Sequence, residues 1–133
     1  MVDIFCAGSL TTNAAKKFAI DYYTIGGIAG TTSGVTLSSD GWLKHWRGRS
    51  AALRTVADSL RVDRKVLERI TELLDKPEVF SFSYEAVGNL TYVLKIQSGD
   101  KYNSISFDQV GDIKGFPESL QKLLSELNKL SNN

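Results

Sequence analysis

Cysteine and histidine are nearly absent from this sequence, and their scarcity excludes several kinds of site. The 133 residues include one cysteine and one histidine. An internal disulfide therefore cannot form, and a zinc site has too few nitrogen or sulfur ligands. A cysteine–histidine pair could join only Cys6 and His45, and Cys6 lies in a small, polar segment with no predicted partner to hold it as a nucleophile. We therefore predict no catalytic residue, no metal, no cofactor and no enzymatic activity.

Long apolar runs and a strong net charge are also absent. No stretch approaches the roughly 18 consecutive apolar residues that mark a membrane-spanning helix, and the opening MVDIFCAGSL lacks the basic segment of a secretory leader. With a net charge of +1, the protein as a whole has no strong electrostatic attraction to nucleic acid or to membranes. We therefore expect a soluble, cytoplasmic protein with no nucleic-acid partner and no membrane span. The alternative is an exported lipoprotein anchored at Cys6, since CAGS resembles the start of mature bacterial lipoproteins.

Length and composition indicate one domain with a short lead-in. Domains cluster at roughly 100 to 150 residues, and a content of 42% hydrophobic and 23% charged residues is typical of a soluble globular protein. Small and polar residues dominate positions 1–16, which predicts a loosely ordered N-terminal lead-in. We assign residues 17–131 to a single α+β domain.

Alternating apolar and polar residues predict several strands. In KFAIDYYTI, residues 17–25, one set of alternate residues is Phe18, Ile20, Tyr22 and Thr24, and β-branched and aromatic residues are enriched, as in a strand. Asp40-Gly41 and Gly99-Asp100 are two-residue turn patterns that favour hairpins. Residues 50–61 fit either a helix or a further strand, and both remain open. The other predicted strands are VTLSS (35–39), WLKHWR (42–47), VFSFSY (79–84), LTYVLKIQ (90–97) and YNSISF (102–107).

Two segments have the 3.6-residue apolar spacing of amphipathic helices. DRKVLERITELLDK begins with Asp63 as a natural N-cap and ends before Pro77. PESLQKLLSEL opens with Pro117 in its first turn, where a missing N–H costs nothing. The order strands, helix, strands, helix predicts an α+β fold, in which an antiparallel sheet of about four to six strands packs two amphipathic helices on one face.

The stretch YTIGGIAGTTSG concentrates four of the eleven glycines in residues 23–34. The glycine spacing fits neither phosphate-loop motif, and a predicted strand rather than a helix follows it. One interpretation is a bulged connection between antiparallel strands. The other is a pliable loop that presents apolar side chains to a partner's cleft. The predicted partner-binding residues are Ile25, Gly26, Gly27, Ile28, Ala29 and Gly30.

The segment KHWRGR interleaves basic and aromatic residues. Such a surface can bind nucleic acid, but the segment is short, and a solvated edge strand protected by its charges explains it better. As a secondary contact surface for a partner, we select four residues from this segment: Lys44, Trp46, Arg47 and Arg49.

Several short motifs together resemble the emfourin-like domain. They are GGIAG, VTLSSDG, DRKVLERITELLDK leading to VFSF, GNLTYVLKI and FPESLQKLLSEL, and the likeness spans about Phe18 to Leu130. The family is named for bacterial proteinaceous inhibitors of thermolysin-type (M4) metalloproteinases. The resemblance implies that residues 17–131 form an emfourin-like domain that inhibits by surface shape, with the 26–30 loop as its contact.

We therefore expect a non-enzymatic protein-binding module whose partner is another protein, such as a thermolysin-type metalloproteinase. Such a module needs a preformed surface and no catalytic group of its own. The main alternative is an accessory or structural subunit of a larger assembly, and an enzyme of an unrecognised kind is a second alternative.

Overall fold

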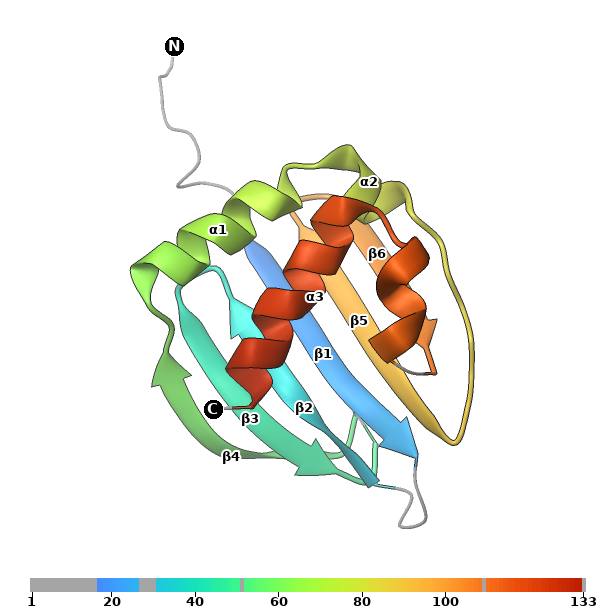
Figure 1. Ribbon diagram of the computed structural model, residues 1–133. Coiled ribbons are helices and arrows are strands. Elements are labelled where there is room, and N and C mark those ends of the chain that lie inside the picture. Colours follow the sequence, from blue (N-terminus) through green and yellow to red (C-terminus); the bar gives the residue numbers. More distant parts are fainter. Residues whose placement is uncertain (1–16, 27–30, 51, 109, 133) are drawn as a thin grey trace.

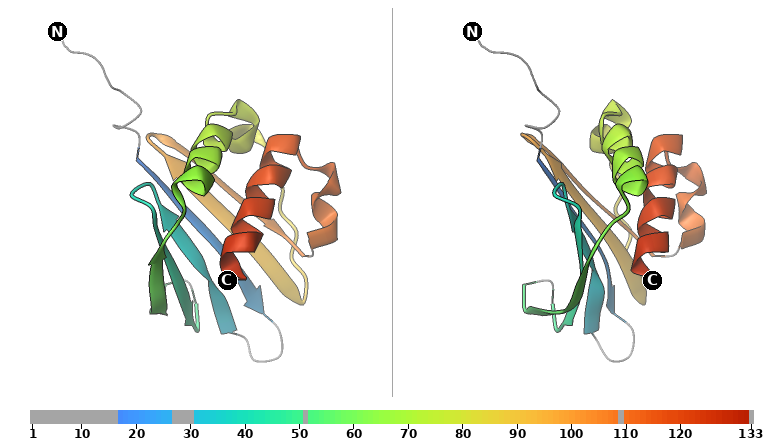
Figure 2. Two further views of the ribbon diagram at one scale, coloured as in Figure 1. Left: turned by 60° about the vertical axis from the view of Figure 1, so that its left-hand side comes forward. Right: turned by 90° about the vertical axis from the view of Figure 1, so that its left-hand side faces the viewer.

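The described residues form a six-stranded antiparallel sheet with all of its helices on one face (Figures 1 and 2). The computed structural model describes residues 17–26, 31–50, 52–108 and 110–132. The strand order is β4-β3-β2-β1-β5-β6, and every neighbouring pair is antiparallel. The strands are β1 (Phe18–Gly26), β2 (Thr31–Ser38), β3 (Trp42–Gly48), β4 (Arg54–Arg61), β5 (Leu90–Ser98) and β6 (Lys101–Phe107).

Helices α1 (Arg64–Leu74) and α3 (Glu118–Ser131) are the two predicted amphipathic helices. Asp63 caps α1, because its carboxylate accepts a hydrogen bond from the Lys65 backbone N–H at 3.2 Å. A short helix, α2 (Pro77–Ser81), and a 3-10 helix (Val110–Gly115) complete this layer. The predicted α+β class and antiparallel sheet are confirmed, with a third α-helix beyond the two expected.

Two details of the predicted strands are wrong. The segment VFSFSY does not form a strand, because Pro77 starts α2 and Val79 turns inward, where it is fully buried. The Asn103 side-chain amide then donates to the carbonyl oxygens of Val79 and Phe82, at 3.0 and 2.8 Å, so a side chain satisfies backbone groups that a sheet would otherwise pair.

β3 is not an edge strand. The segment that fitted either a helix or a strand contains β4, which pairs with β3 through a bulge between His45 and Trp46. The edges of the described sheet are therefore β4 and β6. Every residue of β4 is exposed, which explains why its apolar pattern was too weak to identify a strand.

The main core lies between the sheet and the helices, and α3 contributes the most residues from the helix layer. Ile20, Leu37 and Leu43 occupy one row across β1, β2 and β3, and all are almost fully buried. From the other side, α3 contributes its apolar stripe of Leu120, Leu123, Leu124, Leu127 and Leu130. The apolar stripe of the helix and the inward-facing residues of the strands thus pack together in one apolar layer.

Candidate functional site

The glycine stretch is the connection of the β1–β2 hairpin. Gly26 is the last residue of β1 and pairs with Thr31, the first residue of β2. A strand follows the stretch, so no helix N-terminus is directed at a ligand there. The predicted contact residues Gly27, Ile28, Ala29 and Gly30 lie outside the described residues, whereas Ile25 and Gly26 lie within them.

Gly26 has a structural reason to be glycine. Its φ is 112°, a conformation that residues with a side chain rarely adopt, and a Cβ there would lie 2.5 Å from the carbonyl oxygen of Asn89. The backbone just before β5 therefore passes directly against the end of β1. This close approach joins the hairpin to the loop that precedes β5.

Exposed apolar side chains gather at the end of the sheet that carries this hairpin. The end of β1 lies beside the start of β5, and the start of β4 is at the same end of the sheet, with β2 and β3 in between; this end is at the bottom of Figure 1. Ile25, Leu53, Val87 and Leu90 are found here, with exposed fractions of 41, 70, 81 and 40%. We call these four residues the hairpin end.

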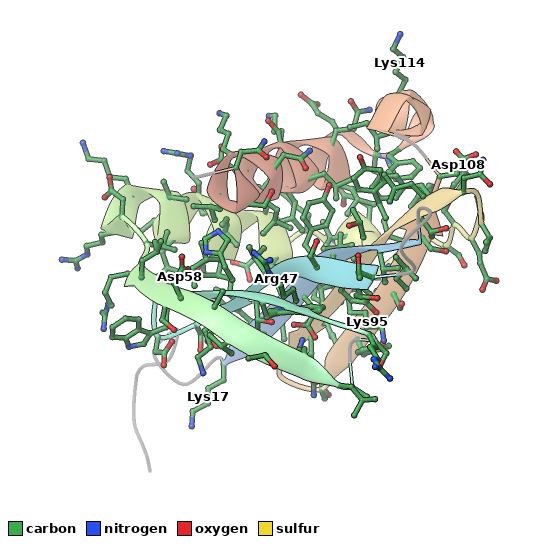
Figure 3. The ribbon with its side chains drawn as sticks, turned by 90° about the horizontal axis from the view of Figure 1, so that it is seen from below. Lys17, Arg47, Asp58, Lys95, Asp108 and Lys114 are labelled. Atoms are coloured by element: carbon green, nitrogen blue, oxygen red, sulfur yellow. The ribbon has the colours of Figure 1, made fainter. Side chains whose placement is uncertain are left out.

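The predicted secondary contact residues do not form one surface. Successive residues of a strand point to opposite faces, so Lys44 and Trp46 lie on the face without helices, which we call the open face. Arg47 lies on the helix side. Figure 3 shows Arg47 on that side of the sheet and Lys95 on the other. Arg49 follows the end of β3.

Trp46 is buried although it lies on the open face. It packs on Tyr23 with ring centroids 5.4 Å apart, and together with Val93 they form a small second core in which each residue is less than 8% exposed. Gly34 of β2 stands between Tyr23 and Trp46 in the register. A glycine at this position leaves room for the two rings to meet above the sheet.

A polar network surrounds this second core. The Trp46 indole N–H donates to Thr36 Oγ1 at 3.0 Å, and Thr36 in turn donates to Asp21. The Arg54 guanidinium lies 4.7 Å above the Trp46 ring and 3.3 Å from the Asp21 carboxylate. The Trp46 ring is therefore covered by the protein's own cation and is not free to stack on a ligand.

Lys95 covers the neighbouring tyrosine in the same way. Its ammonium group lies 5.8 Å from the Tyr23 ring centroid, and a hydrogen bond to the Tyr23 side chain raises the pKa of Lys95. Both aromatic rings of the second core are thus shielded by basic side chains.

A cleft of about 1080 Å³ lies on the helix side, between the C-terminal turn of α3 and the part of the sheet near the hairpin. We call it the α3 cleft. Tyr22 spans it, donating from its hydroxyl to Asn128 Oδ1 at 2.6 Å. Its polar and aromatic lining side chains include those of Tyr22, Thr24, Ser33, Arg47, Arg49, Tyr92 and Asn128. Sequence reasoning missed most of this set, because no local pattern could join Tyr22 to Asn128, 106 positions away.

His45 also borders the α3 cleft, but its free nitrogen is not accessible. Its Nδ1 lies 2.9 Å from Asp58 Oδ1 on β4. Its Nε2 is buried and has no hydrogen-bond partner within the described part of the chain. A histidine acting as general base must reach the proton it removes. In this arrangement the nitrogen opposite Asp58 is closed off from solvent.

The described residues lack two kinds of feature. They hold no group of three or more histidine, cysteine or acidic side chains that could bind a metal ion. They also include no helix of the length and apolarity needed to cross a membrane.

The fold and the two sites define the chain as an α+β domain with an apolar hairpin end and a polar cleft behind it. No protein-family model matches the chain, and no curated protein matches it.

Proposed function

We propose that this protein is a non-enzymatic protein-binding module that contacts its partner with the hairpin end and inhibits a thermolysin-type metalloproteinase. The observation that carries the proposal is that four exposed apolar side chains, those of Ile25, Leu53, Val87 and Leu90, lie at the same end of the sheet. Single exposed apolar residues are ordinary, whereas a group of them at one place is typical of an interaction surface. The choice of a metalloproteinase as partner rests on the emfourin-like motifs of the sequence.

The described part of the hairpin end is held in a fixed position. Gly26 abuts the Asn89 backbone, and the Thr91 hydroxyl both accepts from the Gly88 N–H at 3.2 Å and donates to the Gly88 carbonyl oxygen at 3.4 Å. The residues next to Val87 and Leu90 are thereby tied to the sheet. A surface that is already ordered loses little conformational entropy when it binds, which favours affinity.

The chemistry of the neighbouring groups supports a role in binding rather than catalysis. The buried Nε2 of His45 offers no base to a substrate, and no carboxylate of the described residues lines the α3 cleft. An inhibitor that acts by shape needs neither.

Titration of a purified thermolysin-type metalloproteinase tests this function. We expect wild-type protein to reduce peptide hydrolysis in proportion to its molar amount. Ile25→Asp and Leu53→Asp each place a charge in the proposed apolar contact, and we expect about 30-fold weaker inhibition, the size of an interface hot spot.

The matched control is Tyr102→Asp, which places the same charge at an exposed side chain of β6 at the opposite end of the sheet. It should inhibit like the wild type. Circular dichroism confirms that each variant is folded. Full hydrolysis in the presence of excess wild-type protein, or equal inhibition by all variants, contradicts the proposal.

A second candidate function is an accessory subunit of a larger assembly. The observation in its favour is the edge strand β4, which is exposed along its whole length and has no strand on its outer side among the described residues. Such an edge can accept a strand from another chain. Size-exclusion chromatography of native extract tests it, because a chain that elutes only as a free monomer contradicts this role.

A further inference from the structure

We propose that the α3 cleft binds a small phosphate monoester that carries hydroxyl groups, such as a sugar phosphate. The site is separate from the hairpin end, and the inference does not depend on the function proposed above. The residues that carry it come from four strands and from α3: Thr24, Ser33, Arg47, Tyr92 and Asn128.

The floor of the cleft is a polar row across the sheet. Tyr92, Thr24, Ser33 and Arg47 are neighbours in the register of β5, β1, β2 and β3, and all face the helix side. Four residues further along each strand, away from the cleft, the same face is the apolar core beneath α3. The helix-side surface therefore becomes polar where α3 comes to its end. Such a polar surface suits contact with a polar ligand or with water better than packing against apolar side chains.

The cleft is positively charged. Arg47 and Arg49 line it, and neither makes a hydrogen bond or ion pair to any described residue. The lining contributed by the described residues includes no aspartate or glutamate. By contrast, Arg54 and Arg69 are paired with Asp21 and Glu126. Two unpaired guanidinium groups match the charge of about −2 on a phosphate monoester, and arginine can bind phosphate through two parallel hydrogen bonds.

The end of α3 does not cancel this charge. A helix C-terminus carries about half a negative charge, and its effect falls off within the last turn. The Asn132 N–H and the Ser131 hydroxyl also satisfy the Asn128 carbonyl oxygen, at 3.2 and 3.1 Å. Two full positive charges therefore outweigh the helix end, and the cleft favours an anion.

Neutral polar groups of the cleft can form hydrogen bonds with the hydroxyl groups of the ligand. Burial raises the pKa of Tyr22 to about 12, so its hydroxyl remains protonated and donates to Asn128 Oδ1. Asn128 is thereby oriented, and its Nδ2 group has no partner among the described residues. Together with the hydroxyls of Thr24 and Ser33, it can donate to or accept from a polyhydroxylated molecule.

The volume of the cleft, about 1080 Å³, lies just above the roughly 300 to 1,000 Å³ of ordinary ligand sites, so a sugar phosphate fits without displacing α3. Tyr92 also lines the cleft, and its ring is stacked on those of Phe107 and Tyr22, with ring centroids 5.3 and 6.4 Å away.

Nuclear magnetic resonance titration of the full chain tests this inference, with glucose 6-phosphate, glucose and inorganic phosphate as probes. We expect glucose 6-phosphate to bind tighter than either other probe and to shift the backbone amide signals of Thr24, Ser33, Arg47 and Asn128. Binding should weaken as salt concentration rises.

Arg47→Met replaces the charged guanidinium side chain with an unbranched, uncharged one. We expect the dissociation constant for glucose 6-phosphate to rise about tenfold or more. Arg61→Met is the matched control, because Arg61 lies over Trp42 on the open face. This control should bind like the wild type. Ile25→Asp should also bind normally, which separates failure of this site from failure of the hairpin end.

Three results would overturn the inference. The first is an unchanged dissociation constant in Arg47→Met. The second is equal affinity for inorganic phosphate and glucose 6-phosphate, which would show that the hydroxyl-binding groups contribute nothing. The third is a set of shifted signals centred on Lys44 and Lys95, which would place the anion on the open face.

Discussion

The two faces of the sheet achieve burial in different ways, and two adjacent tyrosines of β1 illustrate the contrast. Tyr22 and Tyr23 are both 4% exposed. Tyr22 faces the helices and is covered by α3, to which it is also hydrogen-bonded. Tyr23 faces the other way, and it is covered by Trp46 of β3, two strands away, and by Lys95 of the adjacent β5. Burial therefore does not require a second layer of secondary structure.

The difference has an energetic consequence. On the helix side, apolar surface is buried against apolar surface, which stabilises by about 25 cal/mol per Å² removed from water. On the open face, burial depends on three apolar residues, a glycine between two of them, and cations that lie over the rings. Exposed cation–ring contacts contribute only about 0.5 to 1 kcal/mol each. The helix side should thus dominate stability, and the open face should be sensitive to shape.

Phe107→Ala should produce the largest effect. The side chain is fully buried and packs on Tyr92 and Phe116, with ring centroids 5.3 and 5.7 Å apart. Its truncation removes apolar contact and leaves a cavity, which typically costs about 3 to 5 kcal/mol. Urea unfolding measures the loss. Tyr102→Ala on the same strand, where the side chain is 58% exposed, should change the free energy of unfolding by less than about 0.5 kcal/mol. Similar losses in both variants would refute the contrast.

Gly34→Ala should have the next largest effect, and it tests the open face. An added Cβ would overlap with the Tyr22 carbonyl oxygen and the Tyr23 Cβ, so the backbone must shift. Overpacking of this kind costs about 1 to 3 kcal/mol, and we expect about 2 kcal/mol in thermal or urea unfolding. Gly115→Ala is the control, because a Cβ there would meet nothing within 4 Å. A Gly34→Ala variant as stable as the control would mean that Tyr23 and Trp46 do not need the glycine.

The Tyr22 hydroxyl predicts a smaller effect that depends on pH. Its folded-state pKa of about 12 lies above the ordinary value of 10.0, so the unfolded chain loses this proton first. The stability linked to this group is complete below pH 10 and falls as the pH rises toward 12. At a pH of about 11, the loss is about 1.4 kcal/mol.

Comparison of wild type with Tyr22→Phe isolates this loss from the titration of other groups. Urea unfolding at a pH of about 9 and about 11 should show the larger decrease in the wild type. Identical decreases in both proteins would show that Tyr22 is not protected by burial.

Much of the fold could be predicted from the sequence, because its determinants are local. Alternation in residues 17–25 identified β1 and both of its faces, and Asp63 marked the start of α1. Gly41 and Gly99 marked two hairpin turns, and both have positive φ. The sequence did not decide between a helix and a strand for the β4 segment, because all residues of β4 are exposed. The α2 segment was predicted as a strand, because only its contacts with the core distinguish a short helix from a strand there.

The candidate sites could be predicted only in part. Ile25 and Gly26 were selected from the glycine stretch. The structure pairs Gly26 with Leu90 and places Leu53 and Val87 at the same end of the sheet, and no sequence pattern connected these residues. Arg47 and Trp46 were selected together, although they lie on opposite faces of the sheet. The bulge between His45 and Trp46 and the pairing of β3 with β4 determine which side chains contact Trp46 and which contact Arg47.

The sequence alone determined the periodicity of every element except β4 and α2, the positions of two hairpin turns and the apolar stripes of the two long helices. These follow from backbone geometry and from side chains a few residues apart. Only the tertiary structure decided which face of the sheet the helices cover, that Tyr23 and Trp46 would form a second core, and that Tyr22 and Asn128 would border one cleft. Those outcomes depend on contacts between distant residues, whose free energy is gained only when the whole chain packs.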